Sequence, residues 1–327
     1  MRFHLTFCSI LAFLLIALVP LKADAAQSFD AWLAEFRTEA RSKGISDQTL
    51  DAAFADVTPI PRVIELDRRQ IEFTMKFDQY LGHVVNGTRI RKGRNLVAKH
   101  QKLLDEVSKK FGVQKRFIVA LWGIETDFGR VTGGFSVIGA LATLAHDGRR
   151  SSFFRRELLL ALKILEDKHI APAEMKGSWA GAMGQNQFMP SSFHSFAIDY
   201  DKDGDKDIWG SLPDVFGSIA NYLSKSGWRD DLTWGREVQL PAGFDKSQIE
   251  KKTKRGLNDW SKLGVKRIDG GALPSRNVMA RIIYVTEKSG NERYFLAYKN
   301  FDVTLKWNRS TYFALAVGNL ADGIGGR

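Results

Sequence analysis

The stretch FIVALWGIETDFGR, residues 117–130, places a carboxylate at the end of an apolar run. Phe117, Leu121 and Glu125 are spaced by four, so on an α-helix they share one face. Trp122 lies about one turn before the acid. Desolvation by these neighbours and the negative end of the helix dipole both disfavour the ionised form of Glu125. The sequence therefore predicts a raised pKa for Glu125, as a general acid working near neutral pH requires.

Simpler interpretations of Glu125 remain open at this point. Helix periodicity alone favours a solvated residue at the helix end, or one paired with Arg130. Asp127 could serve as a second catalytic carboxylate, but residues two apart on a helix do not face each other. Gly129 is expected to let the chain turn and to leave space beside the acid.

The first residues, MRFHLTFCSILAFLLIALVPLKADAA, have the layout of a secretory signal peptide. Arg2 precedes an apolar run, and a small-residue cleavage site ends at Ala25. We expect export with removal of residues 1–25; a retained membrane anchor is the alternative. Cys8, the only cysteine, lies inside the apolar run, so lipidation is not expected. The exported chain would then contain no disulfide.

Composition is ordinary for a soluble globular protein, with 44% apolar and 26% charged residues in a chain of 327. No later run of about 18 apolar residues predicts a membrane span. The net charge of +11 favours an acidic partner, and export makes nucleic acid the weakest candidate. We expect basic clusters such as RIRKGR, residues 89–94, to be mostly solvated faces.

Apolar spacing predicts helices through most of the chain. We expect several helices over 28–112, among them one continuous helix over NLVAKHQKLLDEVSKKFG and another capped by Ser46. Beyond Arg229, the segments REVQLP, VMARIIYVT and RYFLAYKNFDVTLKW have the β-branched and aromatic residues of strands. A last helix is expected over Ser310 to Leu320. The predicted fold class is α+β, mostly α, with a small β-containing module near the C-terminus.

Several motifs in order carry a resemblance to a known family. GIETDFGR, KGSWAGAMGQNQFMPSSF, DYDKDGDKDIWG, GSIANYLSKSGW and WNRSTYFALAV together resemble the lytic murein transglycosylase B family, over most of residues 60 to 322. The resemblance implies a lysozyme-like helical core that cuts the glycan strands of peptidoglycan. We therefore expect a signal peptide over 1–25, an N-terminal helical region over 26–112, a catalytic core over 113–230 and the β-containing module over 231–327.

The resemblance also implies the chemistry. Glu125 matches the family's single catalytic glutamate, which protonates the β-1,4 glycosidic oxygen between N-acetylmuramic acid and N-acetylglucosamine. It then acts as base while the muramic acid C6 hydroxyl attacks C1, giving a 1,6-anhydro sugar. The substrate's N-acetyl group assists, so no second carboxylate is required. Ordinary two-carboxylate hydrolysis is disfavoured if Glu125 acts alone.

Further site residues follow from the matched motifs. By resemblance, the residues that bind substrate are Ser178, Gln187, Tyr222, Trp307 and Asn308. Each has a structural alternative: Ser178 in a turn, Tyr222 in the core, Trp307 packed on a strand. Two positions depart from the family pattern, Asn186 before the glutamine of QFMP and Phe313 in place of a frequent tyrosine.

The acidic loop DYDKDGDKDIWG has the alternating spacing of an EF-hand calcium site. The expected ligands are Asp199, Asp201, Asp203, Asp205 and Asp214. Gly204 is sixth, where the loop must turn sharply, and Gly210 stands where a glutamate ligand is usual, so Asp214 is the substitute. Asp207 is either a water-mediated ligand or exposed. We expect a structural calcium ion and no cofactor for catalysis; a solvated acidic turn is the alternative.

Together these observations predict a monomeric periplasmic lytic transglycosylase of cell-wall turnover whose partner is the peptidoglycan glycan strand. A muramidase-type hydrolase, a non-catalytic calcium-stabilised peptidoglycan-binding protein and an exported scaffold remain alternatives. The sequence does not predict endolytic or exolytic action, a preferred peptide stem, or any partner protein.

Overall fold

The structure of the protein is a computed structural model that describes residues 27–69 and 75–326. The predicted signal peptide over 1–25, and its alternative as a membrane anchor, lie outside these residues. No helix within the described ranges is both long and apolar enough to cross a membrane.

The helices that precede the quoted stretch are α1 (Phe29–Ser42), α2 (Asp47–Phe54), α3 (Pro61–Arg69), α4 (Phe77–Val84), α5 (Gly87–Lys99) and α6 (Gln101–Phe111). Ser46 caps α2 as predicted, since its hydroxyl accepts a hydrogen bond from the amide of Thr49 at 3.2 Å. Such side-chain caps satisfy amides that the first helical turn leaves without partners.

One predicted helix is wrong. The segment NLVAKHQKLLDEVSKKFG does not form one helix, because His100 leaves the helical conformation between α5 and α6. Both helices pack on α7, but the break lets α5 also pack on α15 while α6 packs on α11. The apolar spacing within each half is helical, so periodicity alone could not locate the change of direction.

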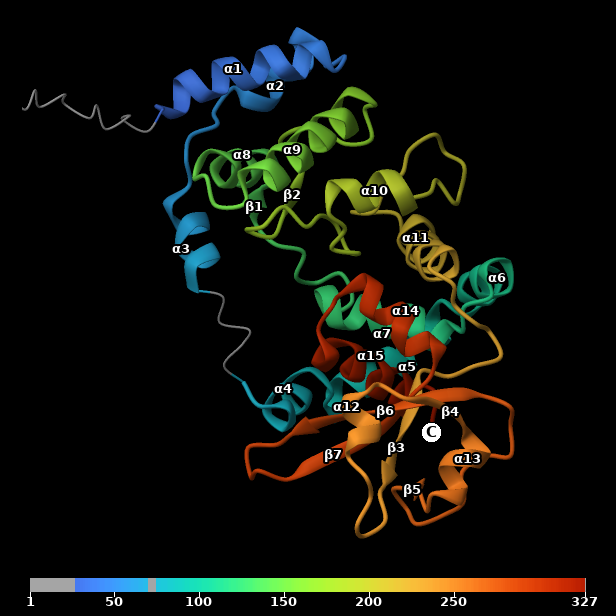
Figure 1. The fold of residues 1–327 in the computed structure, drawn as a ribbon. Helices are drawn as coiled ribbons and strands as arrows, with labels where there is room; N and C mark the ends of the chain where they lie inside the picture. Colours follow the sequence, from blue (N-terminus) through green and yellow to red (C-terminus); the bar gives the residue numbers. More distant parts are fainter. Residues whose placement is uncertain (1–26, 70–74, 327) are drawn as a thin grey trace, which may run out of the picture.

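The quoted stretch forms the central helix of the fold, α7 (Lys115–Thr126). Its residues from Phe117 to Leu121 are fully buried, and α5, α6, α11 and α15 pack around it (Figure 1). A helix that is apolar on all sides belongs in a core. The end of α7 that carries Glu125 is the only part of the quoted run to approach a cleft.

The middle of the chain forms a second helical group, whose first part lies beside α1 and α2, at the far end of the molecule from the large sheet, while its last helix lies against α6 (Figure 1). Its elements are β1 (Phe135–Ser136), α8 (Val137–His146), α9 (Ser151–Glu166), β2 (Lys176–Gly177), α10 (Pro190–Phe196) and α11 (Leu212–Lys225). Strands β1 and β2 pair antiparallel, with Phe135 opposite Gly177. Helix α9 packs on α8, α2 and α10, so this group forms one wall above the end of α7.

The C-terminal module is built on an antiparallel sheet of order β4-β6-β7-β3-β5. Its elements are β3 (Gly235–Gln239), α12 (Ser247–Glu250), β4 (Lys254–Gly256), α13 (Leu257–Lys262), β5 (Lys266–Arg267), β6 (Met279–Thr286) and β7 (Glu292–Ala297). In β6, Ala280 and Ile282 point to one face and are buried in the core of the module, whereas Val285 points to the other face and is buried in the larger core. Both faces of the strand are therefore partly covered.

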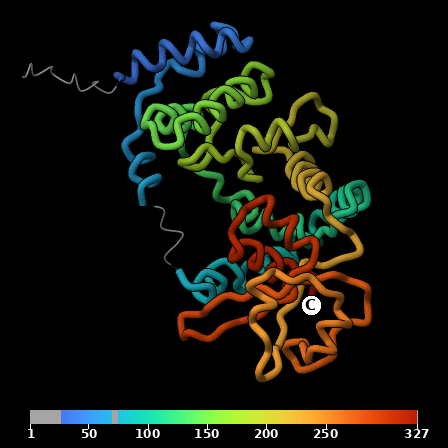
Figure 2. Tube along the Cα trace, viewed as in Figure 1, coloured from blue at the N-terminus to red at the C-terminus, as the bar shows by residue number. Residues whose placement is uncertain are grey.

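The predicted strand RYFLAYKNFDVTLKW is only half right. After β7 the chain forms helix α14 (Lys299–Trp307), and α15 (Thr311–Ile324) closes the fold. Phe301 and Thr304 are buried at helical spacing, and Asn300 is buried beside them. Residue type favoured a strand, whereas packing decides in favour of a helix. Figure 2 shows the chain leaving the module and returning to the helical core. Trp307, at the end of α14, lines the cleft described below.

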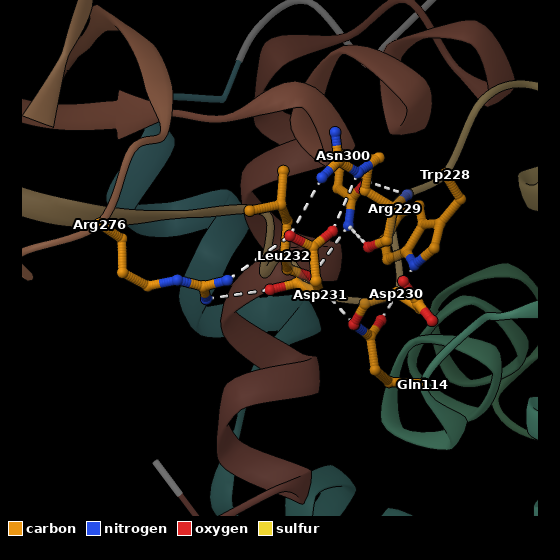
Figure 3. A network of polar contacts seen from close by, with 8 residues as sticks. All are labelled: Gln114, Trp228, Arg229, Asp230, Asp231, Leu232, Arg276 and Asn300. Carbon is orange, nitrogen blue, oxygen red and sulfur yellow. Dashed lines mark hydrogen bonds and ion pairs between the residues drawn. The ribbon is translucent and has the colours of Figure 1, made fainter.

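A polar network ties the module to the helical core (Figure 3). The buried Asn300 side chain donates to the carbonyls of Arg229 and Leu232, at 2.8 and 3.0 Å, and accepts from the amide of Arg229 at 2.8 Å. Gln114, just before α7, donates to the Leu232 carbonyl at 2.9 Å and accepts from the indole of Trp228 at 2.9 Å. These bonds fix the segment between α11 and β3, and with it the approach of α14. The predicted division at residue 231 stays a prediction.

Candidate active site

A cleft of about 630 Å³ lies where the C-terminal end of α7 faces α3, α9 and the end of α14. Its lining residues are Leu66, Arg69, Glu125, Arg150, Phe153, Phe154, Ser178, Trp179, Ala180, Ala182, Gln187, Met189, Trp307 and Asn308. The lining combines apolar and aromatic surface with a few polar groups, which is the usual character of a ligand site. Four of the five predicted substrate-binding residues therefore share one cleft with Glu125.

 

Glu125, Ser178, Gln187, Trp307 and Asn308 thus line the cleft, and Tyr222 does not. Glu125 is half-buried, and its Oε1 accepts a hydrogen bond from the indole Nε1 of Trp307 at 2.7 Å. An N–H donor aimed at a carboxylate stabilises the ionised form of the acid. The contact joins α7 to α14 across 182 residues of sequence, so the spacing of the quoted stretch could not predict it.

The position of Trp307 depends on two aromatic rings behind it. Its ring packs against those of Tyr222 and Phe188, with centroid distances of 4.6 and 5.2 Å. Tyr222 is 8% exposed, and its hydroxyl donates to the carbonyl of Lys306 at 2.7 Å. Tyr222 was expected to bind substrate. That role stays a prediction; the contacts that the structure shows hold Trp307 in place.

The turn after Glu125 is built from left-handed residues: Asp127, Phe128 and Gly129 have φ of 49°, 62° and 79°. Gly129 was expected to leave space beside the acid, and this is wrong. A Cβ at Gly129 would lie 2.2 Å from Oε1 of Gln185, so the glycine makes room for that amide. The same Gln185 oxygen accepts from the indole of Trp122 at 2.8 Å.

Thr126 and Gln185 are positioning residues that the sequence reasoning missed. The hydroxyl of Thr126 donates to the carbonyl of Gln185 at 3.0 Å and accepts from the amide of Gly129 at 3.0 Å. The side chain of Gln185 donates to the carbonyl of Trp209 at 2.8 Å. Both residues are buried, so these bonds fix the end of α7 against the glycine-rich loop. A buried amide in a loop is a weak sequence signal for such a role.

Asp127 has a different environment from that of Glu125. Its carboxylate accepts from Arg130 at 2.6 Å and lies 3.5 Å from Lys92 and 3.6 Å from Arg89. Burial acts to raise the pKa of Asp127, but the hydrogen bond from Arg130 and the charges of Lys92 and Arg89 outweigh it and lower the pKa. Asp127 therefore stays ionised near neutral pH and is a poor proton donor. Arg130, an alternative partner for Glu125, pairs with Asp127.

The basic cluster RIRKGR packs against the core more than the sequence suggested. Arg89 and Lys92 face Asp127, and Arg94 donates to the carbonyl of Gly323 at 2.9 and 2.6 Å. A Cβ at Gly93 would lie 2.6 Å from the side chain of Ile324, so α5 and α15 approach closely here. The expectation of a mostly solvated face holds for the exposed Arg91 and Arg94 and is wrong for the part-buried Arg89.

The loop that contains Ser178 and Gln187 forms one edge of the cleft. The hydroxyl of Ser178 accepts from the amides of Ala180 and Ala182, at 3.3 and 3.0 Å, so it stabilises a turn while lining the cleft. Gln187 has φ of 49°, and its amide group donates to the carbonyls of Thr132 and Gly184, at 3.0 and 2.9 Å. Both side chains thus hold the loop in shape at the cleft edge.

The other predicted positions are placed as follows. Asn308 is exposed at the end of α14, and its Oδ1 accepts from the amide of Ser310 at 2.9 Å. Asn186 is fully buried and donates to the carbonyl of Val215 at 3.2 Å, so this departure from the family pattern lies inside the loop. Phe313 is buried in α15. Trp179, which the sequence reasoning did not single out, adds an aromatic surface to the cleft.

The acidic loop brings together three of its predicted ligands. Within the described residues, Asp199, Asp201 and Asp203 each place a carboxylate oxygen within 4.8 Å of the others. Gly204 has φ of 107°, as expected for the sharp turn at the sixth position. Three convergent carboxylates are hard oxygen donors of the kind that Ca²⁺ prefers, so the residues fit that ion.

Asp205 and Asp214 are placed differently. Asp205 lies 3.7 Å from the Nδ1 of His169. Asp214 is fully buried and accepts from the amides of Tyr200 and Asp207, at 2.6 and 2.7 Å. Asp207, for its part, accepts from amides of the same loop. Asp214 thus supports the backbone of the loop from below the three clustered acids.

The buried position of Asp214 affects its ionisation. Burial raises the pKa of Asp214 from its ordinary 3.8 to about 6. Amide hydrogen bonds from Tyr200 and Asp207 oppose this rise. The negative charges of Asp201 and Asp199 add to it. A divalent cation in the loop would favour the ionised form, so cation binding and protonation of Asp214 should compete.

Comparison with known proteins identifies the family of the chain. The family model for the transglycosylase SLT domain matches residues 28–322. The chain belongs to this family. A relative, the membrane-bound lytic murein transglycosylase B of Escherichia coli strain K12, is 33% identical over 232 residues, which are 69% of this chain and 61% of the relative. The chain therefore spans only about three fifths of that relative's length.

Solved structures of family members have the same fold. SltB3 from Pseudomonas aeruginosa, solved in complex with NAG-NAM-pentapeptide, is 44% identical with a TM-score of 0.88, covering 92% of this chain and 80% of SltB3. It was also solved with NAG-anhNAM-pentapeptide. Slt35 from Escherichia coli, solved in complex with calcium, is 27% identical with a TM-score of 0.77, covering 90% of this chain and 92% of Slt35. The predicted family and the predicted α+β, mostly helical, lysozyme-like fold are confirmed.

Proposed function

We propose that the protein is a lytic transglycosylase of peptidoglycan. It would cleave the β-1,4 bond between N-acetylmuramic acid and N-acetylglucosamine and form a 1,6-anhydro end. The observation that carries the proposal is the half-buried Glu125 in the cleft, held by the Trp307 N–H at 2.7 Å. SltB3 complexes with NAG-NAM-pentapeptide and NAG-anhNAM-pentapeptide support the substrate and the product class.

In the proposed reaction, the protonated Glu125 donates its proton to the glycosidic oxygen as the bond from that oxygen to C1 breaks. The N-acetylglucosamine side leaves with a new hydroxyl. The muramic acid C6 hydroxyl then attacks C1, and its proton passes to the Glu125 carboxylate. Atoms balance without water, and Glu125 ends in the state in which it began, so one carboxyl group is sufficient.

The surroundings of the acid suit both halves of this cycle. Apolar and aromatic lining favours the protonated form that the first step needs. The Trp307 N–H stabilises the carboxylate that the second step needs. We propose that Ser178 and Gln187 hold the loop that borders the bound sugars, that Asn308 contacts an N-acetyl group, and that Tyr222 positions Trp307.

The product end tests this proposal against the hydrolase alternative. Purified murein treated with the protein should release muropeptides that are lighter by one water than hydrolysed fragments, as shown by mass spectrometry. Fragments with free reducing ends would instead support a muramidase. Binding to murein with no released fragment would support a peptidoglycan-binding protein without turnover.

We also propose that the acidic loop binds a structural Ca²⁺ ion. Asp199, Asp201 and Asp203 would supply clustered carboxylate ligands, and Asp214 would support the loop or join the ligands after a small rotation. The calcium complex of Slt35 supports the choice of ion. The loop lies between α10 and α11, and none of its acidic residues lines the cleft that holds Glu125, so the ion would stabilise the fold and take no part in catalysis.

Calcium should raise the thermal midpoint of the protein by about 5 °C or more at pH 7.5, relative to EDTA, because an ion that binds only the folded state stabilises it. The increase in thermal midpoint caused by calcium should be smaller near pH 5. Since the folded pKa of Asp214 is raised, the metal-free protein loses stability as pH rises from about 4 to about 6. Calcium offsets that loss only where Asp214 is ionised.

Differential scanning calorimetry at the two pH values measures this effect. Asp203→Asn should reduce the calcium gain, whereas Asp269→Asn, in an exposed pair with Arg267, should leave it intact. An equal gain for wild type and Asp203→Asn would rule out the loop as the site.

We propose a periplasmic location for the protein, reached through removal of residues 1–25, and a monomeric state. The support for export is the apolar N-terminal run that ends in small residues. The support for the location is the peptidoglycan substrate proposed above.

A further inference from the structure

A second pocket, of about 210 Å³, lies at the boundary between the helical core and the C-terminal module. Arg116 lines it from the start of α7, Arg236 from β3, and Arg276 from the loop before β6. None of these arginines lines the cleft that holds Glu125. The pocket is smaller than the clefts that usually bind drug-sized ligands, so its size fits a small molecule or ion.

Arg236 is a part-buried cation with no acid to balance its charge. Its Nε donates to the hydroxyl of Tyr298 at 2.7 Å. Within residues 27–69 and 75–326, no carboxylate oxygen lies within 4.0 Å of its guanidinium nitrogens. Burying a charge is costly unless the charge is paired, and a guanidinium carries five N–H donors. Arg236 therefore has donors left for an acceptor in the pocket.

The hydroxyl of Tyr298 indicates how close two of these cations come to each other. Tyr298 is 3% exposed, and burial raises the pKa of its hydroxyl. The positive charges of Arg236 and Arg276 both oppose that rise, so both guanidinium groups lie within electrostatic reach of this hydroxyl. Like charges that share a pocket repel each other, and an anion between them would replace this repulsion by attraction.

Arg116 and Arg276 are held in position by groups at the edge of the pocket. The side chain of Arg116 is 11% exposed, pairs with Asp322, and donates to the hydroxyl of Thr233 at 3.0 Å. Arg276 donates to the carbonyl of Asp231 at 3.0 Å (Figure 3). Because these contacts already order the two side chains, a ligand would bind at a smaller cost in conformational entropy.

Two carboxylates also line the pocket, but they do not cancel its positive charge. Asp231 accepts from Arg229 at 2.9 and 3.1 Å, and this contact lowers the pKa of Asp231. Its charge is thus balanced largely by Arg229, which does not line the pocket. Asp230 is exposed, so solvent and salt screen its charge.

We infer that this pocket binds a small oxyanion, either a carboxylate or a phosphate group. Arg236 and Arg276 would donate to its oxygens, since planar guanidinium groups match both kinds of oxyanion in two-point contact. The bound anion would join β3 to Tyr298, which directly precedes α14, and to Arg116 at the start of α7. It would therefore strengthen the boundary between the module and the core. The inference does not depend on the proposed function.

The experiment uses malonate and inorganic phosphate as probes, each at about 10 mM, against chloride at the same ionic strength. EDTA is present throughout, so that phosphate cannot act by removing Ca²⁺ from the acidic loop. Differential scanning calorimetry gives the thermal midpoint of the protein, and isothermal titration calorimetry gives the affinity for each probe.

Arg255→Gln is the matched control for Arg236→Gln. Arg255 is also a part-buried arginine of the module, and no carboxylate oxygen of the described residues lies within 4.0 Å of its guanidinium. It lines a different pocket. General effects of the salts on folding act on both variants alike, so only a specific site can distinguish the two.

A bound probe should raise the thermal midpoint of the wild-type protein by about 2–4 °C. The increase should remain in Arg255→Gln and disappear in Arg236→Gln, whose affinity for the probe should fall at least ~10-fold. A response to one probe alone would support the inference and show whether the pocket prefers a planar or a tetrahedral group.

If Arg236→Gln does not fold, Arg276→Gln takes its place, because the side chain of Arg276 is 55% exposed and its replacement should leave the fold intact. The same loss of the midpoint increase is expected. Equal increases in the wild-type protein and in the variant of the pocket, or no heat of binding for either probe, would overturn the inference.

Discussion

Replacing Glu125 with glutamine is expected to lower kcat on murein by at least ~10³-fold, with little change in binding. The amide is nearly the same size as the carboxyl group and can still accept the Trp307 N–H, so the cleft should keep its shape. It cannot donate a proton to the glycosidic oxygen or receive one from the attacking hydroxyl. Both chemical steps therefore fail together.

Asp127→Asn is the matched control, because it removes a carboxylate two residues away. Asp127 is held ionised by Arg130, Lys92 and Arg89, so its expected role is structural. The variant should retain activity within about tenfold, through weaker packing of the turn. Release of labelled fragments from murein, and sedimentation with insoluble murein, separate turnover from binding. A Glu125→Gln protein with normal turnover would show that the acid has no catalytic role.

Replacing Trp307 with phenylalanine should lower kcat by roughly ten- to a hundredfold. The ring would still pack on Tyr222 and Phe188, but the N–H donor to Glu125 would be lost. A hydrogen bond to a charged group contributes about 1.5–3 kcal/mol, which the carboxylate formed after proton transfer would lose. Because the bond favours the ionised acid, its loss should also move the alkaline limb of the pH–rate profile to higher pH.

Trp228→Phe provides the comparison for this change. It removes the same type of donor, an indole N–H bonded to Gln114 at 2.9 Å, at a position outside the cleft. It should lower the thermal midpoint and leave the pH–rate profile in place. If Trp307→Phe lowers kcat without moving the alkaline limb, the indole acts only by packing.

The sequence predicted elements best where local pattern and packing agree. The apolar run of α7 identified the central helix, Ser46 identified the start of α2, and β-branched and aromatic residues identified β6. Each of these signals depends only on neighbouring residues, so the structure of each element agrees with its prediction. The motifs, taken in their order along the chain, also predicted the family, which composition alone could not predict.

The errors occurred where packing overrides local preference. His100 divides a segment whose apolar spacing is helical throughout, because α5 must also pack on α15 and α6 on α11. Residues after Ala297 have the composition of a strand, yet the buried Phe301 and Thr304 belong to a helix. The break at His100 and the helix after Ala297 both depend on contacts with residues distant in sequence, which a pattern of about ten residues does not contain.

The candidate site shows the same limit. Glu125 was selected by its place on α7, but its contact with Trp307 depends on how α14 returns from the C-terminal module. Gln185 was missed because its role lies in bonds to Trp122 and Thr126, which are distant in sequence. Resemblance named Tyr222 without distinguishing a residue that touches sugar from one that holds Trp307.

The central claim is that Glu125 acts alone and that the sugar's own hydroxyl, rather than water, attacks C1. The most direct test is to digest murein in water enriched in heavy oxygen and weigh the new ends by mass spectrometry. The account predicts anhydro ends without heavy oxygen from the wild-type protein, and none from Glu125→Gln. Heavy oxygen incorporated at C1 of the new ends would contradict it.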